Sequence, residues 1–423
     1  FAQADVNTII ALLAPPDERW DFGGPTSTSA TRLGAGGTAP STASAPGGSG
    51  STPTEIVGAG GTAPSTRLAR FVMFKVPFED VLDADTFKAL EAAAERQSTD
   101  RWRICVRPQR DLLEEGLARD EDEETDTAAK FKTVHIKTAR YEANKWGGKY
   151  LRAPEIFFTI LEKGKGKLVR LGDIAEVRRG FTTGANEFFY LDDETIRHWG
   201  IEPEFLKPVI KSPRECRSIV IKPEDLRYKI FMCHKDKSEL KGTAALEYIK
   251  WGESQKFHLR PTCRGRQRWW DLGIRSKARI NINYLVDETM RFFLKEDGFF
   301  VSDNFQEWHI SSDTFWQAGV TANSTVFQLF ANIAGRANFG GGLMKIQTYE
   351  VAAMQLLSPT TLRAVACRRV LESAGRLELN SADRRALDEV VFDVLGLTQG
   401  EREAVYEAVI ALVRARLEKA RSV

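Results

Sequence analysis

The chain has 423 residues, 42% of them hydrophobic and 28% charged, which excludes wholesale disorder and predicts two or three folded units. Lys and Arg number 60 against 58 Asp and Glu, so the net charge of +2 excludes a chain that is basic throughout. The sequence contains no run of about 18 apolar residues, so it predicts no membrane span. The five scattered cysteines favour a reducing cytoplasm with free thiols.

Two short apolar runs, at residues 6–13 and 71–76, predict strands. Residues 21–67 between them are mostly Gly, Ser, Thr, Ala and Pro, and the phrase GAGGTAPST occurs there twice. A segment so poor in large apolar residues cannot offset the entropy of ordering, so we expect a flexible insertion. The flanking strands can still pair as a hairpin, because the entropy of loop closure grows only logarithmically with length.

Helical spacing of apolar residues predicts a helical region over 84–118, followed by a solvated acidic loop at 120–124. From 149 to 347, short apolar runs such as 156–158 and 228–232 predict a mixed, β-rich domain. The chain from residue 359 shows two apolar stripes separated by a Gly stop and a Thr cap, which predicts two or three helices. The predicted segments are 1–20, 21–67, 68–135, 136–358 and 359–423.

The common catalytic motifs are missing from the sequence. It contains no GxGxxG after a strand, no P-loop, no HExxH and no GxSxG. Cys233 and His234 are adjacent, but the sequence places no two further ligands beside them, so we predict no metal site.

A small polar loop follows the predicted strand that ends at Arg178. Arg179, Thr182, Thr183 and Asn186 lie there among glycines. Such a loop can present backbone N–H groups and small donors to a phosphate or a base edge. An ordinary glycine-containing turn explains the same residues, and the sequence does not decide between the two.

The strongest local charge lies between residues 256 and 279, where eight cations face one acid, Asp271. The cations are Lys256, Arg260, Arg264, Arg266, Arg268, Arg275, Lys277 and Arg279. Aromatic residues, including Trp269, alternate with them, and phosphate clamping with base stacking needs this combination. The alternative is a solvated face whose tryptophans belong to the core.

Five phrases occur in a fixed order along the chain. They are KWGGKYLRAP at 145–154, LGDIAEVRRGFTTGANEFF at 171–189, FLKPVIK at 205–211, YIKWGE at 248–253 and GGLMKIQTYE at 341–350. This order resembles the C-terminal half of adenine-specific DNA methyltransferases of restriction-modification systems, the type with a TaqI-like specificity domain. The resemblance covers about 141–423, and its most specific phrase is RGFTTGANEFF.

The resemblance implies an α+β fold: a remnant of an α/β methyltransferase domain, a mixed α+β target-recognition domain and a C-terminal helical segment. It implies sequence-specific binding of double-stranded DNA. The expected DNA-binding residues are Arg178, Arg179, Thr182, Thr183, Asn186, Lys211, Arg260, Arg264, Arg266, Arg268, Trp269 and Lys345. The opening residues FAQADVNT fit a family pattern in which Phe1 stacks on the flipped target adenine. The alternative is that Phe1 is simply a terminal residue without a role.

The family also has a glycine-containing loop for S-adenosylmethionine and an Asn-Pro-Pro-Tyr motif for the target amino group. Neither Asn-Pro-Pro nor Asp-Pro-Pro occurs in this sequence. We therefore expect the chain to begin after both motifs, to bind no cofactor itself, and to need an N-terminal methyltransferase segment before any methyl is transferred. S-adenosylmethionine is the cofactor expected for the full-length enzyme.

The sequence is compatible with three other functions. The first is a bifunctional restriction endonuclease-methyltransferase, but the Asp…Glu-x-Lys set of a nuclease is not apparent. The second is a phage-defence methyltransferase of the same architecture. The third is an interaction module whose C-terminal helices bind a partner subunit.

Overall fold

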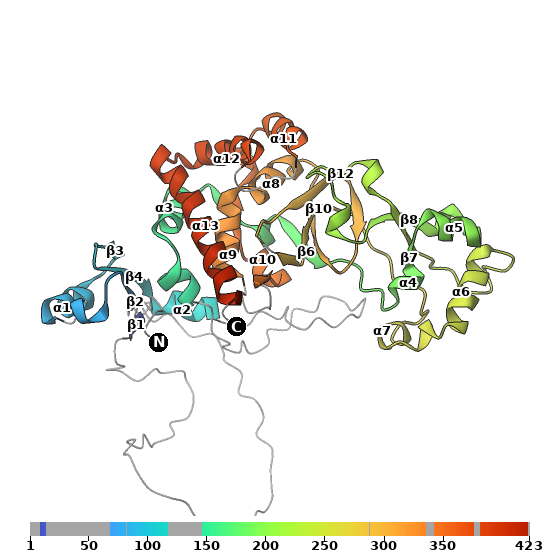
Figure 1. Cartoon of the computed structure of the whole chain (residues 1–423), viewed down its shortest axis with the longest axis horizontal. Coiled ribbons are helices and arrows are strands. Elements are labelled where there is room, and N and C mark those ends of the chain that lie inside the picture. The colour runs from blue at the N-terminus through green and yellow to red at the C-terminus, as the bar shows by residue number, and fades with distance from the viewer. Residues whose placement is uncertain are drawn as a thin grey trace, which may run out of the picture. The chain divides into compact units, whose positions relative to one another are not determined.

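The computed structural model describes residues 9–13, 68–81, 83–116, 146–286, 288–335, 342–375 and 381–421. These residues form two compact units, unit 1 up to Trp146 and unit 2 from Gly147 onward (Figure 1). Phe1, the expected insertion at 21–67 and the acidic run at 120–124 lie outside the described residues. The finer domain boundaries expected from the sequence stay predictions.

Unit 1 contains an antiparallel sheet in the order β1-β2-β4-β3. Its elements are β1 (Ile9–Leu13), β2 (Leu68–Phe74), α1 (Ala84–Ala92), β3 (Gln97–Ser98), β4 (Trp102–Pro108) and α2 (Gln109–Gly116). Ile10 lies opposite Val72, so the two strands on either side of the expected insertion pair antiparallel, as predicted. Val72, Phe74 and Ile104 are fully buried and form the centre of a small core.

The prediction of a helical region over 84–118 is wrong for the middle of that range, which forms β3 and β4. Residues of β4 pair with β2 along its whole length, from Leu68 opposite Pro108 to Phe74 opposite Trp102. The β-branched side chains of Ile104 and Val106 suit a strand, and this long-range pairing overrides the local helical spacing.

Unit 2 is built on a seven-stranded sheet in the order β6-β13-β10-β12-β8-β9-β7. Its neighbouring strands are antiparallel except β12 and β8, where Phe300 lies opposite Val209 in a parallel pair. The strands of the unit are β5 (Leu168–Arg170), β6 (Ala175–Arg179), β7 (Tyr190–Leu191), β8 (Leu206–Ile210), β9 (Tyr228–Phe231), β10 (Ala278–Asn283), β11 (Leu285–Val286), β12 (Phe292–Val301), β13 (Phe305–Ile310), β14 (Met344–Lys345) and β15 (Gln355–Leu357). Two-stranded pairs, β11 with β14 and β15 with β5, complete it.

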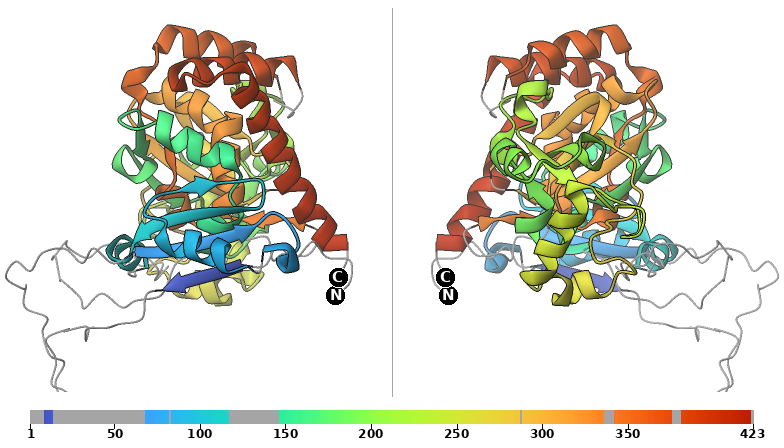
Figure 2. Two further views of the ribbon diagram at one scale, coloured as in Figure 1. Left: turned by 90° about the vertical axis from the view of Figure 1, so that its left-hand side faces the viewer. Right: turned by 90° about the vertical axis from the view of Figure 1, so that its right-hand side faces the viewer.

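Helices gather at the two ends of this sheet, as Figure 1 shows. One group consists of α4 (Asn186–Phe189), α5 (Asp193–Trp199), α6 (Ala244–Ser254) and α7 (Pro261–Arg264). The other consists of α3 (Glu155–Lys163), α8 (Phe315–Ala322), α9 (Thr325–Ala334), α10 (Thr348–Ala352), α11 (Ala364–Ser373), α12 (Ala382–Leu395) and α13 (Gln399–Arg421). Figure 2 shows α13 as the long helix along one side of this second group.

Each end of the sheet has its own core. Trp308 of β13 and Phe327 of α9 are packed with Leu371 and Val391 of the C-terminal helices. The C-terminal helices therefore share one core with the sheet. At the other end, α4 and α6 bury a separate aromatic cluster, in which Phe188 stacks on Tyr248 with 4.6 Å between ring centroids.

The three C-terminal helices confirm the helical tail predicted from residue 359. Helix α12 ends where Gly396 adopts φ 67°, the left-handed conformation that glycine takes most easily. Thr398 then caps α13, because its Oγ1 accepts the N–H of Glu401 while the Glu401 carboxylate accepts the N–H of Thr398. The prediction that the apolar run 156–158 belongs to a β-rich pattern is wrong. These residues lie in α3, where Ile156, Phe157 and Ile160 form one buried helical face.

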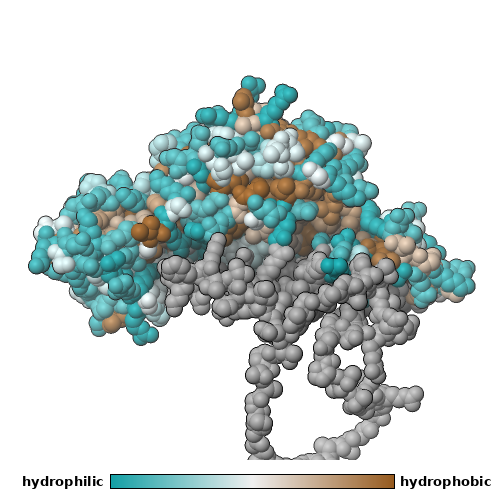
Figure 3. All heavy atoms as spheres, turned by 180° about the vertical axis from the view of Figure 1, so that it is seen from behind, coloured by the Kyte–Doolittle hydropathy of each residue, from teal (hydrophilic) through white to brown (hydrophobic). Residues whose placement is uncertain are grey.

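Mixed helices and sheets confirm the expected α+β class. In the described ranges, the exposed large apolar side chains are Leu259, Ile274, Leu285 and Val365. Hydrophilic residues cover most of the coloured surface in Figure 3, and apolar residues gather in a band across its middle. No helix in the described part of the chain is both long and apolar enough to cross a bilayer.

Candidate nucleic-acid interface

The turn at residues 302–304, between β12 and β13, ties together segments that lie far apart in the sequence. Ser302 Oγ donates to the carbonyl of Lys211 at 2.7 Å, and Asn304 Nδ2 donates to the same carbonyl at 3.3 Å. Arg179 Nε donates to the carbonyl of Asp303 at 3.3 Å. This turn therefore contacts residues at the ends of both β6 and β8.

Tyr284 joins the same turn and carries two cations on its ring. Its N–H donates to the Asn304 carbonyl at 2.7 Å. The guanidinium of Arg179 lies 4.6 Å from the ring centroid and the ammonium of Lys345 lies 4.8 Å from it. The Tyr284 hydroxyl donates to Gln347 Oε1 at 3.2 Å, which fixes the ring. We call Arg179, Lys211, Tyr284 and Lys345 the cationic cluster.

Lys211 also lies against aromatic rings. Lys211 Nζ lies 5.2 Å from the ring centroid of Tyr228 and 5.8 Å from that of Tyr190. A ring face attracts a cation without neutralising its charge. Asp303 is an acid in the same turn, and burial raises its pKa while the charge of Arg179 opposes that rise.

The glycine-rich loop at 180–187 packs closely against its neighbours. A Cβ on Gly180 would lie 2.1 Å from the Ser302 carbonyl oxygen. Gly184 has φ +76°, and a Cβ there would lie 2.6 Å from Thr262 Cβ. Both positions therefore require glycine, and the loop is held in one shape.

Thr183 and Asn186 have different roles within this loop. Thr183 is only 1% exposed, and its Oγ1 donates to Asn186 Oδ1 at 2.5 Å. Thr183 therefore positions Asn186 and is not itself available to DNA in this structure, which corrects the expectation that it binds DNA. Asn186 is exposed at the start of α4, and its amide nitrogen remains to donate outward.

Arg266, two residues after the end of α7, holds the loop in place. Its guanidinium donates to the carbonyl of Thr182 at 2.7 Å and to that of Thr183 at 2.8 Å. It also lies 5.6 Å from the ring centroid of Phe189. Its described contacts position the loop, whereas the sequence suggested a phosphate contact.

Two of the other arginines in the 256–279 stretch are paired with acids. Arg260 donates to both carboxylate oxygens of Glu187, at 2.9 and 3.3 Å, and this hydrogen bonding lowers the pKa of Glu187. Arg268 binds Asp271 at 2.8 Å and Asp236 at 3.1 Å. The charge of the stretch is therefore smaller than the sequence count suggests.

The remaining expected residues of the stretch are divided between the surface and the core. Arg264 is exposed, and within the described ranges its guanidinium has neither a hydrogen bond nor an ion pair. Trp269 is only 7% exposed, packs 4.6 Å from Phe188 and donates its Nε1 to Glu253 at 3.1 Å. The expectation that Trp269 stacks on a base is thus wrong for this structure, because the ring belongs to the core.

Arg178 lies apart from the cluster. Strand β6 alternates its side chains, so Arg178 points to the face opposite Arg179 and binds Glu176 through two hydrogen bonds of 2.7 Å. His234, considered for a metal site, binds Asp271 at 2.7 Å through Nδ1. Tyr284 was not among the expected residues, because its only signal in the sequence is its position at the end of the alternating strand Ala278–Asn283.

Comparison with known proteins places these residues within one family. Residues 143–390 match the family described as type II methyltransferase M.Eco57I, C-terminal domain. The type II methyltransferase M.AccI from Acinetobacter calcoaceticus is 25% identical over 158 residues, which are 36% of this chain and 28% of that protein. The chain thus spans less than a third of the length of this curated relative.

Two solved structures are similar at low identity. The type IIG restriction endonuclease BpuSI is 14% identical, with a TM-score of 0.47 over 84% of this chain and 40% of that one. The type IIL restriction-modification enzyme MmeI, in complex with DNA, is 13% identical, with a TM-score of 0.38 over 60% of this chain and 36% of that one.

The family match confirms the resemblance to methyltransferases of restriction-modification systems. It covers more than half of the chain and includes all four residues of the cationic cluster. The chain therefore belongs to the family of the C-terminal domain of the type II methyltransferase M.Eco57I.

Proposed function

We propose that unit 2 binds double-stranded DNA and reads its sequence for a methyltransferase that modifies adenine. The observation that carries this proposal is the cationic cluster, in which Arg179 and Lys345 lie on the ring of Tyr284 and the backbone carbonyl of Lys211 accepts hydrogen bonds from the 302–304 turn. Cations held on ring faces keep their full charge, so they suit phosphate contacts and the acceptor groups of guanine.

The loop at 180–187 adds a group that can discriminate bases. Asn186 is held through its Oδ1 by Thr183, so its Nδ2 donor has a defined direction. A rigid loop loses little conformational entropy on binding, which favours specific contacts. Arg179 directly precedes this loop, so a side chain suited to phosphate or guanine and one suited to a base edge lie on the same segment.

The chemistry belongs to the longer protein in this proposal. We infer that an N-terminal methyltransferase segment binds S-adenosylmethionine and transfers its methyl group to the adenine amino nitrogen, while unit 2 selects the site. Phe1 would stack on the extruded adenine, since base flipping needs a replacement for lost stacking. Sequencing that detects N6-methyladenine in DNA modified by the full-length enzyme tests this part, and modified cytosine at the site would contradict it.

Selection from a pool of random duplexes tests the DNA-reading part directly. The 423-residue chain is expected to enrich one short sequence, and the enrichment should disappear with Arg179→Ala. The Arg178→Ala variant is the matched control, because Arg178 lies on the opposite face of β6. A chain that retains no duplex above background, or retains all sequences equally, would refute sequence-specific binding.

A further inference from the structure

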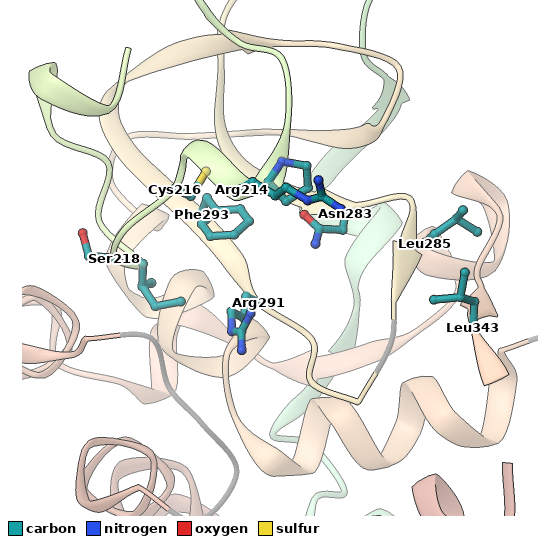
Figure 4. A pocket seen from close by; sticks show the side chains of 10 residues that line it. Arg214, Cys216, Ser218, Asn283, Leu285, Arg291, Phe293 and Leu343 are labelled. Atoms are coloured by element: carbon teal, nitrogen blue, oxygen red, sulfur yellow. The ribbon is translucent and has the colours of Figure 1, made fainter. Parts of the chain in front are cut away.

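A cleft of about 360 Å³ opens in unit 2 beside the cationic cluster. It is lined by residues of the 3-10 turn Pro213–Glu215, the end of β10 and the start of β12. Figure 4 shows Arg214 close to Asn283, Arg291 separated from them by the opening, and Leu285 and Leu343 on one side. The volume is at the lower end of the range of about 300–1,000 Å³ for small-molecule sites, so it suits an occupant of roughly one nucleotide.

The charges of the cleft favour an anion. Arg214 and Arg291 line it, and among the described residues no Asp or Glu does. Arg214 is exposed, and its guanidinium has no hydrogen bond or ion pair within the described part of the chain. The neighbouring Glu215 carboxylate accepts the backbone N–H of Ser212 at 2.7 Å and is not a lining group. A guanidinium group offers the fork of N–H donors that a phosphate accepts, and one such group lies on each side of this opening.

The other lining groups suit a nucleoside attached to that phosphate. Asn283 lines the cleft, and its amide nitrogen has no hydrogen-bond partner among the described residues. This nitrogen can therefore donate to an acceptor atom of a base. Leu285 is 43% exposed although it is apolar, and Leu343 lies with it on the same side of the cleft. A base or sugar covering these side chains would remove apolar surface from water.

We propose that this cleft binds one nucleoside monophosphate unit. Arg214 and Arg291 hold the phosphate, while Asn283, Leu285 and Leu343 contact the nucleoside. The unit comes either from a free nucleotide or from an unpaired nucleotide of a nucleic acid. The inference goes beyond the proposed function, because binding of a free nucleotide requires neither duplex recognition nor methyl transfer.

Calorimetry with the 423-residue chain tests the ligand class. Deoxyadenosine monophosphate should bind at least tenfold more tightly than deoxyadenosine or inorganic phosphate. If only unpaired nucleotides of nucleic acid bind, a duplex with a one-nucleotide bulge should bind at least tenfold more tightly than the paired duplex. Phosphate binding as tightly as the nucleotide would overturn the nucleotide assignment, as would failure of both the nucleotide and the bulged duplex.

Matched variants test the location. Arg214→Ala and Asn283→Asp should each weaken the nucleotide or bulge effect at least tenfold, the second by placing in the cleft a carboxylate that repels the phosphate. Arg217→Ala is the control, since Arg217 is exposed in the same segment but does not line the cleft. Circular dichroism monitors folding. Unchanged affinity in both cleft variants would overturn the location, whereas loss of paired-duplex binding alone concerns only the proposed function.

Discussion

Arg179 lies with its guanidinium 4.6 Å from the ring centroid of Tyr284, although the two residues come from distant parts of the sequence. The contact depends on the 302–304 turn, which accepts a hydrogen bond from each of them. A cation on a ring face contributes about 0.5–2 kcal/mol and keeps its charge available to a second partner. The pair thus links the fold of the sheet to the proposed reading of DNA.

The first prediction concerns this arginine. Arg179→Ala should reduce discrimination between the selected duplex and random DNA by about 1–3 kcal/mol if the side chain reaches a base edge. Arg178→Ala should leave discrimination unchanged, because Arg178 is paired with Glu176 on the other face of β6. Competition titrations of both variants measure this, and equal losses of discrimination would refute a reading role for Arg179.

The second prediction separates free from paired charge. Each phosphate contact contributes about 0.9 to the slope of log K against log salt, so Arg264→Ala should lower the slope magnitude by about one. Arg268→Ala should change the slope little, because Arg268 is already paired with Asp236 and Asp271. Binding titrations at four or more salt concentrations give both slopes. An unchanged slope for Arg264→Ala would show that this arginine contacts no phosphate.

Arg266 provides a third prediction, about stability. Replacing it by Ala removes hydrogen bonds from a charged donor to the carbonyls of Thr182 and Thr183, and each such bond contributes about 1.5–3 kcal/mol. Arg266→Ala should therefore lower the free energy of unfolding by at least that amount, whereas Arg264→Ala should change it by less than about 0.5 kcal/mol. Urea denaturation compares the two, and equal stability would contradict the clamping role.

These residues also show which parts of the site the sequence predicts. The local sequence pattern predicted β6 and the polar loop that follows it, because an alternating strand followed by glycines is easy to recognise. The count of charges from 256 to 279 overestimated the free positive charge of this stretch. Arg260 pairs with Glu187 and Arg268 pairs with Asp236, and both acids come from other segments. A local sequence pattern cannot predict ion-pair partners that lie far away in the sequence.

The same limit explains the errors in secondary structure and burial. The apolar residues on either side of β4 have helical spacing, but β4 itself pairs with β2 and is therefore a strand. Helix α1 separates β2 from β4 in the sequence, so a local pattern does not show this pairing. Trp269 lies among arginines in the sequence and still packs against Phe188, since α4 and α6 close over it. Tyr284 was missed because its importance depends on two cations from β6 and β14.

The fourth prediction isolates the steric requirement at Gly184. Gly184 and Gly166 both have positive φ, +76° and +74°, so alanine at either costs about 1–2 kcal/mol in backbone strain. A Cβ on Gly166 meets nothing within 4 Å, whereas one on Gly184 would clash with Thr262. Gly184→Ala should therefore destabilise the chain more than Gly166→Ala in urea denaturation. Equal losses would show that the loop moves aside freely.

The last prediction concerns the pH dependence of stability. Asp388 lies in the C-terminal helices and accepts the N–H of Thr325 at 2.6 Å and its Oγ1 hydrogen at 2.5 Å. Burial raises the pKa of Asp388, and the charge of Arg384 and the bonds from Thr325 only partly oppose that rise. A raised pKa means that the folded state binds the proton more tightly than the unfolded state.

The contribution of this proton to the free energy of unfolding is therefore complete below about pH 3.9, the pKa of the carboxyl in the unfolded chain. It is lost as the pH rises through the pKa of the carboxyl in the folded chain. Asp388→Asn stays neutral at every pH, and the Thr325 hydroxyl can turn to accept from its amide. The unfolding free energy of the parent chain minus that of Asp388→Asn should thus fall as the pH rises from about 4 towards 8. Urea denaturation across this range measures the difference. A difference that stays constant or rises would show that the carboxyl is not held with a raised pKa.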